Sequence, residues 1–430
     1  MTASPESVRS RDRRHVWHTW SPLSADRARL MFSHGDGYRI WDVDGREFID
    51  GLSLGATCGY SHPDVARAVS EQISQLHGVD LSVASHELAG LLAERLSSYL
   101  PETLSKTLFV NSGSEGIEAA VLIAAEYWSH VGEPRSRVVT FTRGYHGSTV
   151  ISRSLSGLPR VGHPFQSPLP VTFVDLPVSP RDLRRPESLP LLLEAFRNAL
   201  EEDASAQPSA VVVEPFLNVG GGVVLPYGFL RGLRELCDTY GALLILDEVF
   251  TAYGRAGRMF ACHREAVEPD ILVSSKGLSG GYVPIAAVTV QRHIHDTFEN
   301  EPLIGGLRYG HTTSGHAVGC AAALATLDVL EKESLPERAE HFGGLLVDRL
   351  GGLAGIGDVV DVRRFGLVLV VEMCSADAAS RAVARAEDKG LLLRQLGDTM
   401  MAVPALTIGD EGITAIADRI EYAVAAARAG

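Results

Sequence analysis

The chain has 430 residues, of which 45% are hydrophobic, and its formal net charge at pH 7 is −14. This length predicts two or three domains with sizeable cores, and the acidic balance argues against a protein that binds nucleic acid phosphates. No signal peptide and no apolar stretch long enough to span a membrane stand out. The five cysteines are scattered without CxxC spacing, which predicts no disulfide framework, no metal site and a cytoplasmic location.

The N-terminal stretch "YRIWDVDGREFIDG" predicts a β-hairpin with an Asp-Gly turn. Further along the chain, short apolar runs alternate with helical patterns, and seven runs have the composition of strands: 105–110, 137–141, 170–175, 210–215, 242–249, 270–275 and 286–290. Apolar strands separated by helices are typical of a mostly parallel sheet that is covered on both faces. The stretch 177–208 is polar and rich in proline, which predicts a surface excursion.

These patterns predict an α/β protein in three parts. Residues 1–60 are expected to be an N-terminal segment that joins a small domain, residues 61–320 a large domain with a mostly parallel seven-stranded sheet, and residues 321–430 a smaller α+β domain. The last part begins with the helical pattern "CAAALATLDVLEKE" and continues with two apolar runs spaced by amphipathic helices.

Polar groups follow five of the predicted strands directly: "NSGSEG", "TRGYHGS", "EP", "DEV" and Lys276. In parallel sheets, functional groups collect at the carboxyl ends of the strands. Lys276 is notable because only four of the 39 basic residues are lysines. Arginine cannot lose its proton near neutral pH whereas lysine can, so Lys276 is a candidate nucleophile, with a solvated loop lysine as the alternative.

Two of these strand ends have the character of ligand contacts. In "NSGSEG" (111–116), Gly113 allows a tight turn and Ser114 can stand at a helix start, where free N–H groups favour a phosphate. The alternative is an ordinary serine N-cap. Asp247 ends a very apolar strand; it either caps a turn or, if buried, needs a cationic partner such as a protonated heterocycle nitrogen.

Tyr145, in "GYHGST", either lies on a flat ligand or is half-buried in the core. "GLSGG" matches the G-x-S-x-G pattern of hydrolases with Ser279 as nucleophile, but Lys276 occupies the turn where that serine should stand. Asp247 lies one helix crossover before Lys276, so the two are predicted to end adjacent strands. A lysine, a carboxylate, a phosphate-binding turn and a stacking tyrosine together predict pyridoxal 5′-phosphate (PLP) as cofactor.

With these residues the chain resembles a class III aminotransferase among the fold-type I PLP enzymes. The likeness runs from about residue 28 to residue 430 and rests on six motifs: "NSGSEGIEAA", "GYHGST", "VVVEP", "LILDEVFTAYGRAGRMFA", "PDILVSSKGLSGGYVP" and "HTTSGHAVGCAAALATLDVL". It implies a homodimer with shared active sites and a ping-pong transfer through aldimine and ketimine forms.

The resemblance also implies roles for matching positions. Lys276 would hold the cofactor as a Schiff base and move a proton between substrate and cofactor, while Asp247 would keep the pyridine nitrogen protonated. The other cofactor contacts would be Gly113 and Ser114 on the phosphate, Tyr145 and Val249 on the ring, and Thr312 on the phosphate of the neighbouring subunit.

Substrate preference is indicated by Arg394 and Met401. Met401 stands where ornithine- and GABA-type members carry an arginine, which weakens glutamate as the amino donor. Arg394 matches the arginine of ω-amino acid or amine:pyruvate transaminases and of diaminopelargonate synthases, where it pairs with a substrate carboxylate; a surface arginine is the alternative. Trp20 matches an aromatic wall of the pocket in those subgroups, and Tyr145 would contact substrate as well.

The small residues Gly55, Ala56 and Thr57 predict room for a bulky or extended amine. The expected function is transfer of an amino group between an amine or ω-amino acid and a carbonyl acceptor such as pyruvate. Alternatives are a diaminopelargonate-synthase-like aminotransferase, or an aminomutase, racemase or decarboxylase on the same scaffold. A PLP-binding regulator is a further alternative, but only about 30 residues precede the predicted fold.

Overall fold

The computed structural model describes residues 4–23, 30–52, 56–162, 166–203 and 206–428. Within these residues one sheet has seven strands, here called the large sheet. In spatial order they are β4 (Leu104–Val110), β12 (Ala286–Gln291), β11 (Ile271–Ser274), β10 (Leu243–Asp247), β7 (Pro208–Val213), β5 (Arg137–Phe141) and β6 (Val171–Val174). All seven strands that the sequence predicts are confirmed, with bounds that shift by a few residues.

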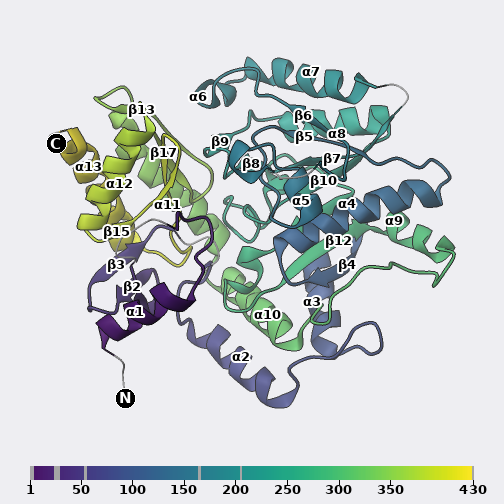
Figure 1. The fold of residues 1–430 in the computed structure, drawn as a ribbon, viewed down its shortest axis with the longest axis horizontal. Coiled ribbons are helices and arrows are strands. Elements are labelled where there is room, and N and C mark those ends of the chain that lie inside the picture. Colours follow the sequence, from purple (N-terminus) through teal and green to yellow (C-terminus); the bar gives the residue numbers. More distant parts are fainter. Residues whose placement is uncertain (1–3, 24–29, 53–55, 163–165, 204–205, 429–430) are drawn as a thin grey trace.

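The large sheet is mostly parallel, as predicted. Strands β11, β10, β7, β5 and β6 pair in parallel, whereas β12 runs antiparallel to both of its described neighbours, β11 and β4. Parallel neighbours require crossover connections, which the helices on the right-hand side of Figure 1 supply. The carboxyl ends of β7, β10 and β11 therefore lie side by side at one edge of the sheet.

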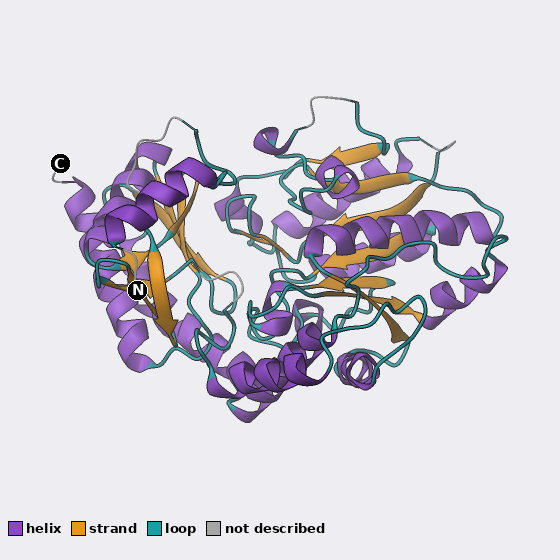
Figure 2. Ribbon diagram, turned by 60° about the horizontal axis from the view of Figure 1, so that its bottom comes forward, coloured by secondary structure: helices purple, strands orange, loops and turns teal. Residues whose placement is uncertain are grey.

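Alternate residues of each strand point to opposite faces of the large sheet and build two cores. In β10, Leu243 and Ile245 pack in a core with α4 (Gly113–His130), whereas Leu244 and Leu246 pack in a core with α7 (Ser188–Glu201) and α8 (Phe229–Tyr240). Figure 2 shows helices on both faces of the strands. Burial on both faces explains why the strands read as continuous apolar runs.

The other α-helices lie around this sheet and in the C-terminal part of the chain. They are α1 (Pro5–His15), α2 (Pro63–Gln75), α3 (Glu87–Ser98), α5 (Val150–Ser154), α6 (Pro180–Leu183), α9 (Arg292–Asp296), α10 (Ala317–Lys332), α11 (Leu335–Leu350), α12 (Ala376–Asp388) and α13 (Asp410–Arg428).

A four-stranded antiparallel sheet, here called the small sheet, forms in the C-terminal part. Its order is β13 (Val359–Arg364), β14 (Leu369–Met373), β17 (Thr399–Ala402) and β16 (Arg394–Leu396). A further sheet joins β1 (Phe32–Asp36), β2 (Arg39–Asp42), β3 (Glu47–Asp50) and β15 (Leu391–Leu392). The small sheet places Arg394 at an edge strand, which matters for the site below.

The predicted N-terminal hairpin is confirmed: β2 and β3 pair antiparallel, and Gly45 in their turn has a φ of +85°. Strand β3 also pairs in parallel with β15, so the N-terminal segment contacts the C-terminal part of the chain, as the purple and yellow ribbons of Figure 1 show. The domain boundaries at residues 60 and 320 stay predictions, and the second one falls inside α10.

The prediction of a surface excursion at 177–208 is wrong. The segment contains α6 and the 14-residue helix α7, and Leu192 and Phe196 of α7 are fully buried. The ring of Phe196 packs edge-on against Phe141 of β5, with the ring centroids 4.9 Å apart. The run "SLPLLLEAFRNAL" has apolar residues at helical spacing. The prolines hide this pattern, although Pro180 begins α6, Pro186 precedes α7 and Pro190 lies in the first turn of α7, where proline is tolerated.

No helix among the described residues is both long and apolar enough to cross a lipid bilayer. The five cysteines are free thiols, and only Cys374 of them is exposed. Within the same residues, histidine, cysteine and carboxylate side chains form no cluster suited to a metal ion.

Candidate active site

Three neighbouring strands of the large sheet end at the same edge and bring polar side chains together. Asp247, the last residue of β10, lies opposite Val273 of β11, and the residue before it lies opposite the last residue of β7. Lys276 follows β11 and Glu214 follows β7, so these two residues flank Asp247. The prediction that Asp247 and Lys276 end adjacent strands is confirmed.

Lys276 occupies a strained turn. Its φ is 32°, in a region that non-glycine residues seldom adopt, and it begins the short 3-10 helix η3 (Lys276–Ser279). Backbone strain of this kind is concentrated at functional sites, where the surrounding structure imposes it. Burial lowers the pKa of Lys276, the charges of Asp247 and Glu214 raise it, and the charge of Arg394 lowers it further, so that the net shift is downward. The neutral amine, which is the nucleophilic form, is therefore favoured at this position.

Asp247 is buried beside a histidine for which the sequence predicts no role. Its Oδ2 lies 2.8 Å from Nδ1 of His146, and its Oδ1 accepts the backbone N–H of Val249 at 3.1 Å. Burial lowers the pKa of His146, but the hydrogen bond and charge of Asp247 and the charge of Glu214 outweigh it, so the net shift is upward. A protonated His146 stabilises an ionised Asp247 inside the protein.

Glu214 is a second buried carboxyl group at this edge. Its Oε1 accepts the backbone N–H of Tyr145 at 3.0 Å, and its Oε2 accepts that of Asn218 at 3.4 Å. Burial, helped by the charge of Asp247, raises the pKa of Glu214 to about 7. Glu214 therefore changes charge in the neutral pH range, close to Asp247 and Lys276.

The N-terminus of α4 reaches the same edge. Its N-cap is Ser112, whose side chain accepts the N–H of Glu115 at 3.3 Å while the Glu115 carboxylate accepts the N–H of Ser112 at 3.1 Å. This capping box makes Ser112 the cap and leaves Ser114 in the first turn. A helix start of this kind presents N–H groups and a partial positive charge, which favour an anion such as phosphate.

Two glycines let other segments approach this helix start closely. A Cβ on Gly113 would lie 2.7 Å from two side-chain carbons of Val249. A Cβ on Gly147, whose φ is +141°, would lie 2.6 Å from Oγ of Ser114. The same Oγ accepts the backbone N–H of Ser148 at 3.1 Å. The start of α4 thus forms a close-fitting cradle with the loop after β5 and the segment after β10.

These groups line one cavity of about 1030 Å³. Its wall includes eight of the nine residues to which the resemblance assigns a role, all except Thr312: Trp20, Gly113, Ser114, Tyr145, Asp247, Val249, Lys276 and Arg394. Thr312 is exposed and lies outside the described wall. Its predicted contact is with a neighbouring subunit, so that role stays a prediction.

The cavity wall also carries aromatic and cationic groups. The rings of Trp20 and Tyr145 meet edge to face, with centroids 6.3 Å apart. Arg394 lies beside them in β16, and its buried Nη1 finds no hydrogen-bond partner in the part of the chain that the structure describes. Burial, and then the charge of Arg160, lowers the pKa of Arg394. A guanidinium in such surroundings is stabilised by an anionic ligand group.

The predicted room for a bulky amine stays a prediction. Gly55 lies outside the described residues. Ala56 and Thr57 are not part of the described cavity wall, and the Thr57 hydroxyl donates to the carbonyl of Gly277, 3.5 Å away.

Sequence reasoning did not assign His146, Glu214 or Asn218, which also line the cavity. Glu214 could have been predicted from the sequence, because this carboxyl group stands at the end of an apolar strand, as Asp247 does. His146 had no such signal, since its partner Asp247 is 101 residues away in sequence.

The hydrolase alternative is not supported. Ser279 is the last residue of η3, and its hydroxyl donates to the carbonyl of Val283 at 2.6 Å. A nucleophilic serine needs a base as its hydrogen-bond partner, and this hydroxyl is instead bound to a backbone carbonyl.

The residues of the cavity fit PLP. An amine with a lowered pKa can bond to the aldehyde, a buried carboxylate can pair with a protonated ring nitrogen, and the α4 start can receive the phosphate. The close approach of Gly113 to Val249 leaves no space for a side chain between the phosphate cradle and the ring site.

The comparisons with known proteins agree with this site. The family model described as "Aminotransferase class-III" matches residues 22–424. The chain is 32% identical to an adenosylmethionine-8-amino-7-oxononanoate aminotransferase of Geobacter sulfurreducens, over 97% of both chains. It is 31% identical to a β-alanine–pyruvate aminotransferase of Pseudomonas aeruginosa, over 94% of this chain and 95% of the relative.

A solved structure has the same fold as this chain. An amine transaminase from an uncultivated Pseudomonas species, crystallised with PLP bound, superposes with a TM-score of 0.91 at 30% identity, over 96% of this chain and 99% of that one. The chain belongs to the class III aminotransferase family. It is a PLP-dependent enzyme of fold type I, as the sequence predicts.

Proposed function

We propose that this aminotransferase moves an amino group from an ω-amino acid or amine to a keto acceptor such as pyruvate. The observation that carries the proposal is the shared cavity of Lys276 and Arg394. Lys276 serves the reacting end of the substrate, and the half-buried Arg394 offers its buried, unpartnered Nη1 to a carboxylate at the other end. The β-alanine–pyruvate aminotransferase among the relatives has this kind of substrate in its name.

PLP, when bound, supplies the electron sink that makes the C–H bond beside the amino group acidic. Gly113 and Ser114 would hold its phosphate through the α4 start, and Tyr145 and Val249 would contact its ring. Nζ of Lys276 would hold the aldehyde group of the cofactor. As a neutral amine, Nζ would also be able to take a proton from the substrate carbon.

Asp247 and His146 would keep the ring nitrogen protonated. The 2.8 Å contact with Nδ1 of His146 gives Asp247 a cationic partner inside the protein, and a carboxylate in this position would stabilise a proton on the ring nitrogen. Glu214 adds a carboxyl group that titrates near neutral pH beside Lys276 and Asp247. It holds the N–H of Tyr145, so it also orients the loop that carries the ring contact.

Trp20, Tyr145 and Arg394 would define the substrate side. The edge-to-face pair of Trp20 and Tyr145 forms an apolar wall next to the guanidinium. This arrangement suits a substrate with an aliphatic middle between an amine and a carboxylate. A dimer with shared sites, in which Thr312 contacts the phosphate of the neighbouring subunit, and a cytoplasmic location are parts of the same proposal.

The test is a half-reaction screen. Purified enzyme with PLP is mixed with β-alanine, longer ω-amino acids, amines without a carboxylate, or S-adenosylmethionine, and conversion of the cofactor to its aminated form is followed by absorbance. We expect conversion by ω-amino acids and return of the original spectrum with pyruvate. Lys276→Ala should abolish conversion, and Lys332→Ala, at an exposed position, should leave it unchanged.

Other outcomes would favour the alternatives. Conversion by S-adenosylmethionine alone would favour the diaminopelargonate-synthase-like function that the Geobacter relative's name suggests. An isomerised, racemised or decarboxylated product without a keto acceptor would favour an aminomutase, racemase or decarboxylase.

A further inference from the structure

Four residues form one row across the small sheet. In register, Arg363 of β13 lies opposite Val370 of β14, Val370 lies opposite Met401 of β17, and Met401 lies opposite Arg394 of β16. Residues directly opposite one another in antiparallel strands point to the same face. Arg363 and Arg394 therefore stand at the two ends of one row, with two buried apolar side chains between them.

The hairpin loop 218–222 lies on this row. It connects β8 (Phe216–Leu217) and β9 (Val223–Val224), which pair antiparallel. A Cβ on Gly222, whose φ is +64°, would lie 2.8 Å from a methyl carbon of Val370 and 3.4 Å from Sδ of Met401. The backbone of the loop thus rests directly on the middle of the row, and a side chain at Gly222 would lift it away.

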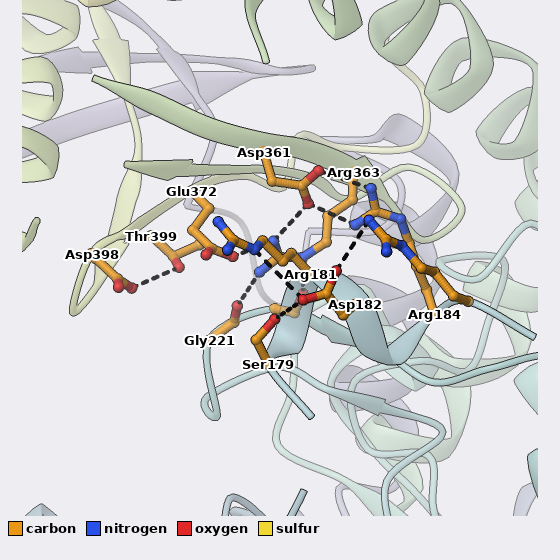
Figure 3. A network of polar contacts seen from close by, with 12 residues as sticks. Ser179, Arg181, Asp182, Arg184, Gly221, Asp361, Arg363, Glu372, Asp398 and Thr399 are labelled. Atoms are coloured by element: carbon orange, nitrogen blue, oxygen red, sulfur yellow. Dashed lines mark hydrogen bonds and ion pairs between the residues drawn. The ribbon is translucent and has the colours of Figure 1, made fainter. Parts of the chain in front are cut away.

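Arg363 fixes the same loop from one end of the row. Its Nε donates to the carbonyl of Gly222 at 2.8 Å, and its Nη2 donates to that of Gly221 at 3.0 Å. Its Nη1 donates to Asp361 at 2.9 Å and to Glu372 at 2.6 Å. Figure 3 shows this guanidinium between the two carboxylates and the loop. Because Arg363 is only 3% exposed, these contacts determine its position.

The first carbonyls of the loop are held by other arginines. Arg160 donates to the carbonyl of Val219 at 3.3 Å, and Arg143 donates to that of Gly220 at 3.1 Å. Four consecutive carbonyls, from residue 219 to residue 222, therefore accept hydrogen bonds from three arginines. Asn218 and Val219 line the cavity, so the loop forms part of the wall that faces the substrate.

We propose that Arg363 is a positioning residue that sets the width of the substrate side of the cavity. Arg363 anchors loop 218–222 to one end of the row, and Arg394 stands at the other end. The apolar side chains of Val370 and Met401 lie between the two arginines and keep them apart. The inference rests on the proposed function, in which Arg394 binds the substrate carboxylate. Loosening the loop should weaken substrate binding while the chemistry at Lys276 continues.

A purely structural role of Arg363 predicts a different result from a positioning role. A substitution of Arg184 can distinguish these two roles. Arg184 forms a bidentate ion pair with Asp361 on the outer side of the same network. Its Nη1 donates to Oδ2 at 2.7 Å, and its Nη2 donates to Oδ1 at 2.8 Å. Among the described residues Arg184 forms no hydrogen bond or ion pair with loop 218–222, so Arg184→Met removes an ion pair and leaves the loop held. If the network only stabilises the fold, Arg184→Met and the Arg363 variants should affect the melting temperature, KM and hydrogen exchange of the loop in the same way.

The variants at Arg363 are chosen to separate charge from geometry. Arg363→Lys keeps a cation for Asp361 and Glu372 but cannot reach both loop carbonyls, since an ammonium lacks the planar fork. Arg363→Met leaves Glu372 without its cation, and the double variant Arg363→Met/Glu372→Gln removes that unpaired charge. The double variant should therefore unfold at a higher temperature than Arg363→Met and still have a loose loop.

The measurements are KM and kcat for an ω-amino acid, melting temperature, and hydrogen exchange of the Gly221 and Gly222 amides, which donate to the carbonyl of Asn218. We expect Arg363→Lys and the double variant to raise KM about tenfold or more, to change kcat less than about threefold, and to speed exchange at both amides. Arg184→Met should lower the melting temperature without these changes.

The proposal is overturned if exchange and KM of Arg363→Lys equal those of the wild type. It is also overturned if the double variant recovers the wild-type KM together with its stability, or if Arg184→Met raises KM equally. Failure of the proposed function is a separate result: the wild type would then convert no ω-amino acid. Hydrogen exchange would still show whether Arg363 holds the loop.

Discussion

His146 Nδ1 lies 2.8 Å from Oδ2 of Asp247, and both side chains are buried. A buried carboxylate is costly unless it is paired, and this histidine supplies the pairing cation from within the protein. The contact links the loop after β5 to the end of β10, so the charge of Asp247 does not depend on the ligand alone.

Replacing His146 should therefore act through Asp247. In His146→Asn the carboxylate loses its cationic partner, so it holds the ring nitrogen of the cofactor less firmly and kcat should fall. A hydrogen bond to a charged group is worth about 1.5–3 kcal/mol, which corresponds to a roughly 10- to 100-fold loss of kcat at neutral pH. The exposed His295 provides the control, because His295→Asn should leave kcat unchanged. A wild-type kcat in His146→Asn would contradict this role.

Glu214 should make stability depend on pH. Its pKa is about 7 in the folded protein, against an ordinary value of 4.5 for a glutamate side chain, so the folded state retains a proton that the unfolded state releases. The stabilising contribution is complete below about pH 4.5 and is lost as pH rises through 7. We expect the free energy of unfolding to fall by ~1–3 kcal/mol across this window, and Glu214→Gln to remove that fall.

Urea unfolding at pH 5 and pH 8 measures this difference. Glu94→Gln, at an exposed helical position, is the matched control and should keep the wild-type pH dependence. If the free energy of unfolding changes equally between pH 5 and pH 8 in Glu214→Gln and in the wild type, Glu214 does not titrate in this window.

Arg394 should discriminate substrates by their carboxylate. Arg394→Met removes the guanidinium but keeps an unbranched apolar side chain in β16. We expect KM for an ω-amino acid to rise about 10- to 100-fold, as for loss of a charge-assisted hydrogen bond, and KM for an amine without a carboxylate to change little. Steady-state kinetics with a matched pair of substrates checks this. A similar rise for both substrates would remove the carboxylate role.

Gly113 should control cofactor affinity. Gly113→Ala places a Cβ within 2.7 Å of Val249, so the helix start and the segment after β10 must separate. We expect PLP to bind at least ~10-fold more weakly, as measured by titration of the apoenzyme. The double variant Gly113→Ala/Val249→Ala removes the clash and should recover part of the affinity. Wild-type affinity in Gly113→Ala alone would show that the two segments do not need this contact.

The sequence predicts the large sheet well because its strands are buried on both faces. Burial makes runs such as "LLILD" continuously apolar, and a polar residue such as Asp247 then marks the strand end. Helix α7 was hidden because prolines before a helix are read as loop signals although the first turn tolerates them. Its buried Phe196 follows the helical spacing that the prolines obscured.

Parts of the site depend on contacts between distant segments, which spacing along the chain does not reveal. His146 reaches Asp247 across 101 residues. Arg363 and Gly222 are 141 residues apart, and only the register of the small sheet brings them together. Lys276 was predictable because it ends an apolar strand, but its positive φ is imposed by the turn that follows.

The pairing of β3 with β15 affects how the enzyme can be assembled during synthesis. Strand β15 ends two residues before Arg394, and its parallel partner β3 is synthesised long before it. The sheet that joins β3 to β15 is therefore completed only after all strands of the large sheet have been synthesised. The nascent N-terminal hairpin would wait with an unpaired edge, which is a natural point for a chaperone to bind.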